Sequence, residues 1–152
     1  MTYRWPRPQT LAITTVFAAA AAAMLAFSRP VEMMVDGVRV TSDVPPVTTA
    51  SREVFVPLRT IAEALGAEML AERDGSIVVV RGNQSLRLVV GQQHAMLNAM
   101  PFTFHHAPFR VRGRVMVSLS AISRAFNVQA KYDARTARVD VTSTTGTPGT
   151  PN

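Results

Sequence analysis

Cysteine is absent from this chain of 152 residues. Without thiols the chain has no disulfide framework, no thiolate metal site and no cysteine nucleophile. The protein must therefore rely on its hydrophobic core for stability. Its length suffices for one domain with a modest core, and leaves no room for a separate catalytic domain once targeting segments and tails are subtracted.

Charge is absent from residues 11–27, a run of 17 residues dominated by alanine. Arg4 and Arg7 precede this run, and no acidic residue does. This pattern predicts that residues 1–28 are a secretory signal peptide, cleaved after Ser28. The alternative is an uncleaved membrane anchor, although the run is slightly short for a spanning helix. Both cases predict an extracytoplasmic protein, secreted or in the cell envelope, that meets the membrane only through this segment.

Large apolar side chains are missing from residues 143–152, which contain Pro148 and Pro151. Such a segment has nothing to anchor it and cannot form regular strand pairing. We therefore predict a disordered tail over residues 143–152.

A strong excess of either charge is also missing. Removing residues 1–28 deletes two of the 16 basic residues and leaves 14 against 10 acidic ones, a net charge of +4. This charge does not favour a nucleic-acid partner. Its distribution is uneven, because residues 31–91 hold six basic and eight acidic residues, whereas residues 92–141 hold seven and two. The second half is thus predicted to be the side that faces polyanions.

The chain does contain an internal repeat, since residues 54–66 match residues 115–127 at a constant offset of 61. Pro57 and Ser118 suit the start of a helix, and Gly66 and Asn127 suit the left-handed conformation that ends one. Each match therefore predicts a helix of about nine or ten residues. Both helices have one apolar stripe at helical spacing, formed by Leu58, Ile61 and Leu65 in the first and by Leu119, Ile122 and Phe126 in the second.

Strand patterns flank both predicted helices. Asp36-Gly37 and Asn98-Ala99 lie at the centre of candidate hairpins upstream, and β-branched runs lie downstream. We predict an α+β fold of two tandem ββ-β-α-ββ units, residues 31–91 and 92–142. The two helices are expected to pack on one continuous antiparallel sheet that wraps around them.

Two motifs in the first unit, VPLR at residues 56–59 and EALGA at residues 63–67, resemble a known family. They are similar to the stalk domain named after the N-terminal domain of copper amine oxidases, found in bacterial surface and secreted proteins. The resemblance covers roughly residues 31–142. It implies an antiparallel sheet wrapped around helix, an extracytoplasmic location and no catalysis. The second unit departs from the motif, with Ser118, Ser120 and Asn127 in place of proline, arginine and glycine.

The residues do not favour a cofactor, although the family name invites copper or a quinone. His105 and His106 are neighbours that would point apart in an extended segment, and only His94 remains. The tyrosine of the predicted mature chain, Tyr132, is placed at a strand start, where it is expected to be a half-buried packing residue. The sequence thus predicts no catalytic residues, no metal ligands and no cofactor.

Arginines recur at every second position in Arg110, Arg112 and Arg114. In an extended segment this spacing would place three guanidinium groups on one face, where they could bind a polyanion through forked hydrogen bonds. The alternative is a solvated turn, because Gly113 suggests that the strand starts only afterwards. The three arginines are our candidate polyanion-binding residues.

These observations predict a non-catalytic exported stalk domain that acts as a structural or binding module of the cell envelope. Its partner would be a cell-wall polymer, an anionic envelope component or another envelope protein. Two alternatives remain: an accessory or regulatory subunit of a cell-wall hydrolase, and a membrane-anchored assembly partner.

Overall fold

The computed structural model describes residues 30–144. The predicted signal segment, residues 1–28, lies outside these residues, as do residues 145–152 of the predicted tail. Ser143, the first residue of that predicted tail, belongs to a strand, because its backbone N–H and hydroxyl are bonded to Asp36. Between residues 30 and 144, none of the helices has the length and apolar character needed to cross a membrane.

The described residues form three β-sheets around two short helices, which makes the fold α+β as predicted. Sheet A has the order β12 (Val128–Asp133), β13 (Arg138–Ser143), β1 (Glu32–Val35), β2 (Val38–Val40). Sheet B has the order β10 (Phe109–Val111), β11 (Arg114–Ser118), β4 (Val54–Pro57), β3 (Val47–Thr48). Sheet C has the order β5 (Glu68–Ala71), β6 (Ser76–Arg81), β7 (Gln84–Val89), β8 (His94–Leu97), β9 (Met100–Thr103). The helices are α2 (Leu58–Ala64) and α3 (Leu119–Phe126).

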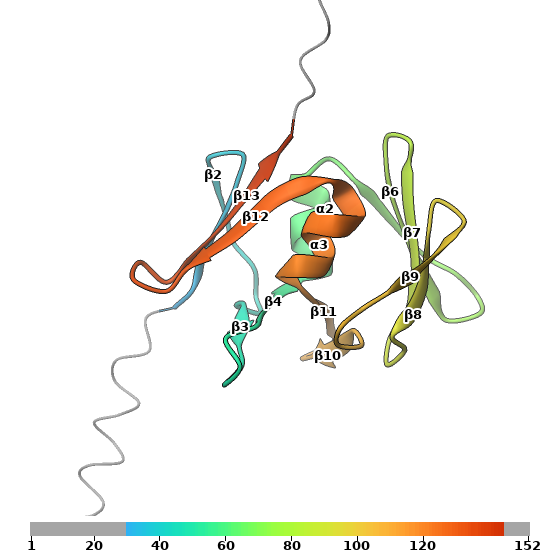
Figure 1. The fold of residues 1–152 in the computed structure, drawn as a ribbon, viewed down its shortest axis with the longest axis horizontal. Coiled ribbons are helices and arrows are strands. Elements are labelled where there is room, and N and C mark those ends of the chain that lie inside the picture. The colour runs from blue at the N-terminus through green and yellow to red at the C-terminus, as the bar shows by residue number, and fades with distance from the viewer. Residues whose placement is uncertain (1–29, 145–152) are drawn as a thin grey trace, which may run out of the picture.

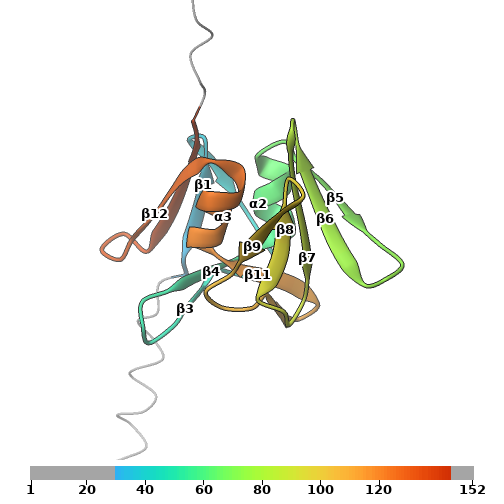
Figure 2. The ribbon, with the colours of Figure 1, turned by 45° about the vertical axis from the view of Figure 1, so that its right-hand side comes forward.

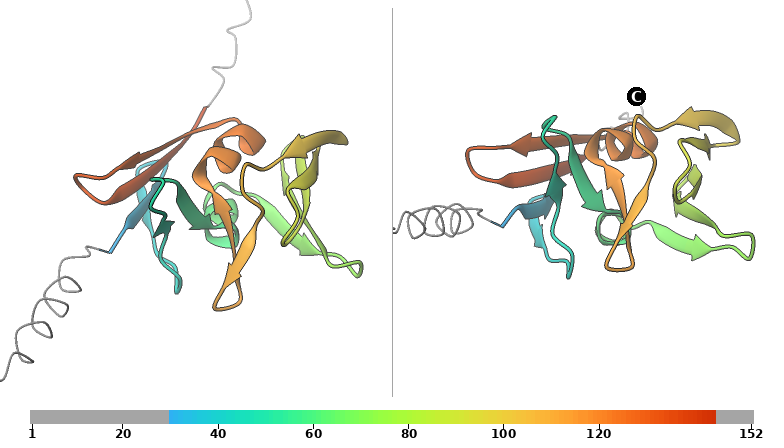
Figure 3. Two further views of the ribbon diagram at one scale, coloured as in Figure 1. Left: turned by 60° about the horizontal axis from the view of Figure 1, so that its bottom comes forward. Right: turned by 90° about the horizontal axis from the view of Figure 1, so that it is seen from below.

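The helices lie between sheets A and C, and sheet B crosses one end of the molecule (Figures 1 and 2). The view from below shows the same arrangement, with sheets A and C on either side of the helices (Figure 3). The expectation of one continuous antiparallel sheet was therefore wrong. The strands form three separate sheets, and β1 pairs with β13 in parallel.

The repeat relates the parallel pair β13 and β1 to two strands of sheet C that lie on either side of β7. In sheet C, β7 lies between β6 and β8 and is antiparallel to both, so β6 and β8 run in the same direction. The offset of 61 relates β6 to β13 and β8 to β1, but among the described residues no strand follows β13 as β7 follows β6. Strands β13 and β1 pair directly and in parallel.

The centre of sheet B joins the two matching segments. Strand β4 pairs with β11 so that Val56 lies opposite Val117, 61 residues further along the chain. On either side, Pro57 faces Met116 and Phe55 faces Ser118, which makes the pairing symmetrical about the valines. The tandem layout of residues 31–91 and 92–142 stays a prediction.

Both helices lie where the sequence places them, but at seven and eight residues they are shorter than the nine or ten predicted. The Ser118 hydroxyl caps α3 by accepting a hydrogen bond from the backbone N–H of Ala121 at 3.3 Å. Pro57 lies just before α2, one position earlier than its predicted place. Gly66 and Asn127 have left-handed backbones, with φ of 74° and 49°. The predicted stripe residues are all buried in one core cluster: Leu58, Ile61, Leu65, Leu119, Ile122 and Phe126.

Arg81, at the end of β6, holds the C-terminal ends of both helices. Its guanidinium donates to the carbonyl of Leu65 at 3.0 Å and to that of Phe126 at 3.2 Å. A third hydrogen bond reaches the Ser143 hydroxyl at 2.9 Å, and Ser143 donates from its backbone N–H and hydroxyl to the Asp36 carboxylate at 2.6 and 2.8 Å. One side chain thus connects three sequence-distant parts of the domain.

Candidate anion-binding cleft

The three candidate arginines lie on a tight β-hairpin. Arg110 belongs to β10 and Arg114 to β11, and the chain reverses at Arg112 and Gly113, whose φ angles are 48° and 81°. The premise that an extended segment aligns three guanidinium groups on one face was therefore wrong. The alternative of a turn at Gly113 is confirmed, and all three arginines are exposed. Whether they bind a polyanion stays a prediction.

Arg114 has an acidic partner, which the sequence did not reveal. Its Nε lies 3.0 Å from both carboxylate oxygens of Asp43, and its Nη2 lies 2.9 Å from Oδ2. The hydrogen bond from Arg114 is the main reason that the pKa of Asp43 falls below its ordinary value. The pair fixes the position of the Arg114 guanidinium and offsets part of its charge.

Arg110 and Arg59 are less engaged. Arg110 donates from Nη1 to the backbone carbonyl of Gly113 at 3.1 Å. Arg59 lies 3.7 Å from Glu63 on the same helix, and both side chains are at least half exposed, so this pair contributes little. Both guanidinium groups therefore retain hydrogen-bonding capacity.

These arginines line one cleft, which we call the arginine cleft. It has a volume of about 280 Å³ and lies between the β10–β11 hairpin, the first turn of α2 and the β5–β6 hairpin. Arg59, Arg110 and Arg114 contribute three guanidinium groups, and Glu72 contributes a carboxylate. Arg112 does not line the cleft. The fold therefore brings together two of the three predicted arginines and adds Arg59, which the sequence reading had not assigned to the site.

A second cleft of about 470 Å³, which we call the tyrosine cleft, lies between the loop before β4, the loop after β9, α3 and β12. Tyr132 is half-buried and packs against the main core, as predicted, but it lies near the end of β12 and not at a strand start. It also lines this cleft. Ser120 and Arg52 contribute exposed polar groups.

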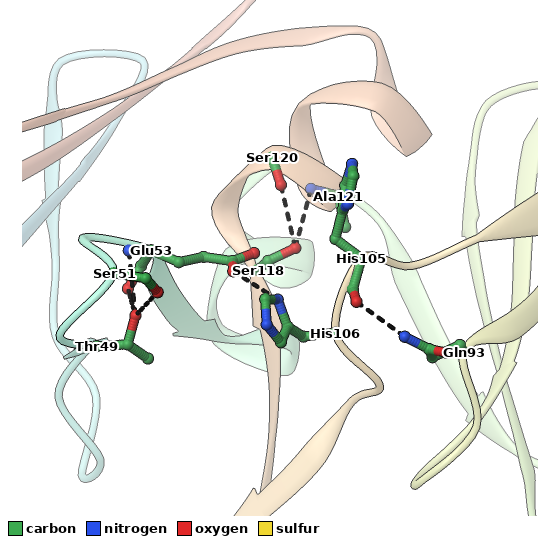
Figure 4. A network of polar contacts seen from close by, with 9 residues as sticks. All are labelled: Thr49, Ser51, Glu53, Gln93, His105, His106, Ser118, Ser120 and Ala121. Atoms are coloured by element: carbon green, nitrogen blue, oxygen red, sulfur yellow. Dashed lines mark hydrogen bonds and ion pairs between the residues drawn. The ribbon is translucent and has the colours of Figure 1, made fainter.

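Two of the histidines that the sequence analysis considered also line the tyrosine cleft. The imidazole of His106 contacts the Glu53 carboxylate at 2.5 Å, and the ring of His105 is turned away from it (Figure 4). His94 lies in β8, outside this cleft. Between residues 30 and 144 no three His, Cys, Asp or Glu residues are grouped so that they could hold a metal ion.

The fold defines a class of small α+β domain in which three sheets surround two helices. Residues 34–141 match the family model described as the copper amine oxidase N-terminal domain, so the chain belongs to this family. The N-terminal domain of this family is a non-catalytic stalk domain. No curated protein matches the sequence.

Proposed function

We propose that this protein is an exported binding module of the cell envelope that holds an anionic polymer in the arginine cleft. One observation carries the proposal: three guanidinium groups from separate elements converge on one cleft that contains a single carboxylate. Guanidinium groups bind carboxylates and phosphates with two parallel hydrogen bonds, which makes them suited to polyanions.

The three arginines have different roles in this proposal. Asp43 holds Arg114 in place, so its guanidinium forms a fixed wall of the cleft. Arg59 and Arg110 are free to turn towards a ligand, since their described contacts are a weak ion pair and one backbone carbonyl. The ligand would thus be bound chiefly by Arg59 and Arg110.

The location of the cleft suits a module that acts by contact. The cleft is open to solvent and its arginines are exposed, so a long polymer can approach without being threaded. Export rests on the basic start and the uncharged run at residues 11–27.

Retention on isolated cell envelope tests the binding. The double variant Arg59→Ser/Arg110→Ser should bind at least about tenfold more weakly, because each lost hydrogen bond to a charged group contributes roughly 1.5–3 kcal/mol and 1.4 kcal/mol is tenfold. The matched control is Arg112→Ser/Arg135→Ser, which removes the same charge outside the cleft. Retention should also fall with salt, because exposed charges are screened within ~10 Å at 0.1 M. Equal losses in both variants would contradict a defined cleft.

Export has its own test. Residues 1–35 fused to a reporter that is active only outside the cytoplasm should give activity. The change Ala20→Arg/Ala21→Arg should abolish it, because charge in the centre of the apolar run opposes insertion. Full activity of this variant would contradict a signal or an anchor.

A further inference from the structure

The tyrosine cleft and the arginine cleft are built from matching positions of the repeat, and each takes residues from both halves of the chain. Adding or subtracting 61 relates six lining positions of the two clefts. The related pairs are Arg59/Ser120, Met69/Ala130, Ala71/Tyr132, Gly113/Arg52, Arg114/Glu53 and Val115/Val54. Both clefts therefore arise from the same backbone arrangement, in which the first turn of a helix, a post-helix strand and the approach to a central strand meet.

The side chains at these related positions have changed in character. Serine stands in place of one cleft arginine and glutamate in place of another, whereas Arg52 stands in place of Gly113. The six positions thus hold two positive groups in the arginine cleft, and one positive and one negative group in the tyrosine cleft. The charges of Arg52 and Glu53 offset one another. A site with this balance does not favour a polyanion.

What the tyrosine cleft offers is an apolar floor with a polar rim. Val54 and Leu119 are buried, and the half-buried ring of Tyr132 adds an aromatic surface. Exposed donors and acceptors surround this floor, namely the hydroxyl of Ser120, the guanidinium of Arg52 and the imidazole of His105. Apolar and aromatic walls with a few placed polar groups are the usual composition of a small-ligand site.

The Glu53 carboxylate is part of the same rim and is held in place. Its side chain is only 20% exposed, and its partner is His106, whose ring packs edge-on against Phe55 at a centroid distance of 5.9 Å. These contacts hold the carboxylate where it can accept hydrogen bonds from a ligand. A fixed acceptor beside an aromatic ring suits a molecule that has both hydroxyl donors and C–H faces.

We infer that the tyrosine cleft is a second ligand site, and that its ligand is a neutral, hydroxyl-rich sugar ring. The ring of the sugar packs on Tyr132 and the apolar floor, and its hydroxyl groups bond to Glu53, Arg52 and Ser120. This site is independent of the arginine cleft. A polymer with both neutral sugars and anionic groups could occupy the two clefts together.

The test is a titration of the ¹⁵N-labelled full-length protein with two neutral tetrasaccharides, one of N-acetylglucosamine and one of glucose, followed by amide NMR shifts. The expected result is saturable shifts at residues 52–54, 105, 120 and 132. Shifts with both sugars assign recognition to the hydroxylated ring, and shifts with the first alone assign it to the acetamido sugar. No saturable shift with either sugar, or shifts centred on Arg59 and Arg110, would overturn the inference.

Two variants at related positions form the matched pair. Ser120→Trp should fill the tyrosine cleft from the exposed first turn of α3 and abolish the sugar shifts. Arg59→Trp places the same side chain in the arginine cleft, and should leave the sugar shifts unchanged while weakening retention on cell envelope. Tyr132→Phe keeps the ring and should bind within about threefold of the parent, a change of at most about 0.7 kcal/mol. Equal sugar binding by the parent and Ser120→Trp would place the sugar elsewhere, whatever the outcome for the arginine cleft.

Discussion

Replacing Arg81 by methionine should destabilise the domain strongly, although Arg81 touches neither cleft. The guanidinium supplies a hydrogen bond to the last turn of each helix, through the carbonyls of Leu65 and Phe126, and a third to Ser143. These carbonyls are at the ends of helices, where backbone acceptors lack partners and carry partial negative charge. The methionine variant keeps much of the side-chain length and loses every one of these bonds.

The magnitude follows from the contacts. A hydrogen bond from a charged donor contributes roughly 1.5–3 kcal/mol when it is shielded from solvent, and a cation at a helix C-terminus contributes roughly 0.3–1 kcal/mol. Arg81 is half-buried, so solvent weakens each interaction. We therefore expect a loss of about 2–4 kcal/mol in the free energy of unfolding. With a urea slope of about 2 kcal/mol per molar, the midpoint should fall by about 1–2 M.

Urea unfolding followed by circular dichroism measures this change. The control is Arg73→Met, which removes the same charge from an exposed turn position where no side-chain hydrogen bond or ion pair is found within residues 30–144. It should shift the free energy by less than about 0.5 kcal/mol, as surface changes do. If Arg81→Met behaved like the control, Arg81 would not connect the two helices in solution.

Three further changes test other parts of the fold. Phe126→Ala should lower the free energy of unfolding by about 3–5 kcal/mol in urea unfolding, because the ring is fully buried; a loss below about 0.5 kcal/mol would remove it from the core. Ala99→Gly should raise the melting temperature, because Ala99 has a φ of 62° in the β8–β9 turn and this left-handed conformation costs an L-residue roughly 1–2 kcal/mol. The greater backbone entropy of glycine in the unfolded chain offsets part of this gain. An unchanged or lower melting temperature would contradict the prediction. The backbone hydrogen bond from Ser143 is the main reason that the pKa of Asp36 is lowered, so the stability that Asp36 contributes is present above pH 3.8 and is lost as the pH falls through the lower folded pKa. Asp36→Asn should therefore flatten the loss of stability below about pH 4. An unchanged dependence of stability on acid pH would exclude this role.

Local signals in the sequence predicted the helices well. Ser118, Gly66 and Asn127 are residues whose own chemistry starts or stops a helix, and the apolar stripes specify which face is buried. None of these signals depends on distant parts of the chain. The six predicted stripe residues are accordingly in the core.

Sheet organisation was less predictable, because it depends on distant pairing. The parallel contact of β1 with β13 joins residues about 106 positions apart, as in Glu32 with Arg138. No local pattern specifies this partner. In sheet C the corresponding strands β6 and β8 are separated by β7, whereas β13 and β1 pair directly.

The residues of the arginine cleft were likewise predictable only where neighbouring residues determine the structure. Gly113 signalled the turn, whereas the spacing of the arginines alone suggested an extended segment. Asp43 and Arg114 are 71 residues apart, and nothing near either one predicts their pairing. Arg59 joins the cleft only because β10 and β11 fold back towards the first turn of α2.

Side-chain NMR of the arginines tests most directly whether an anionic polymer binds in the arginine cleft. The ¹⁵N-labelled full-length protein is titrated with a soluble anionic wall polymer, and the Nε–H signals of Arg59, Arg110, Arg112 and Arg135 are followed. Binding in the arginine cleft predicts saturable shifts for Arg59 and Arg110, with Arg112 and Arg135 nearly unmoved. Shifts of similar size at all four arginines, or at Arg112 before Arg110, would contradict a defined anion-binding cleft.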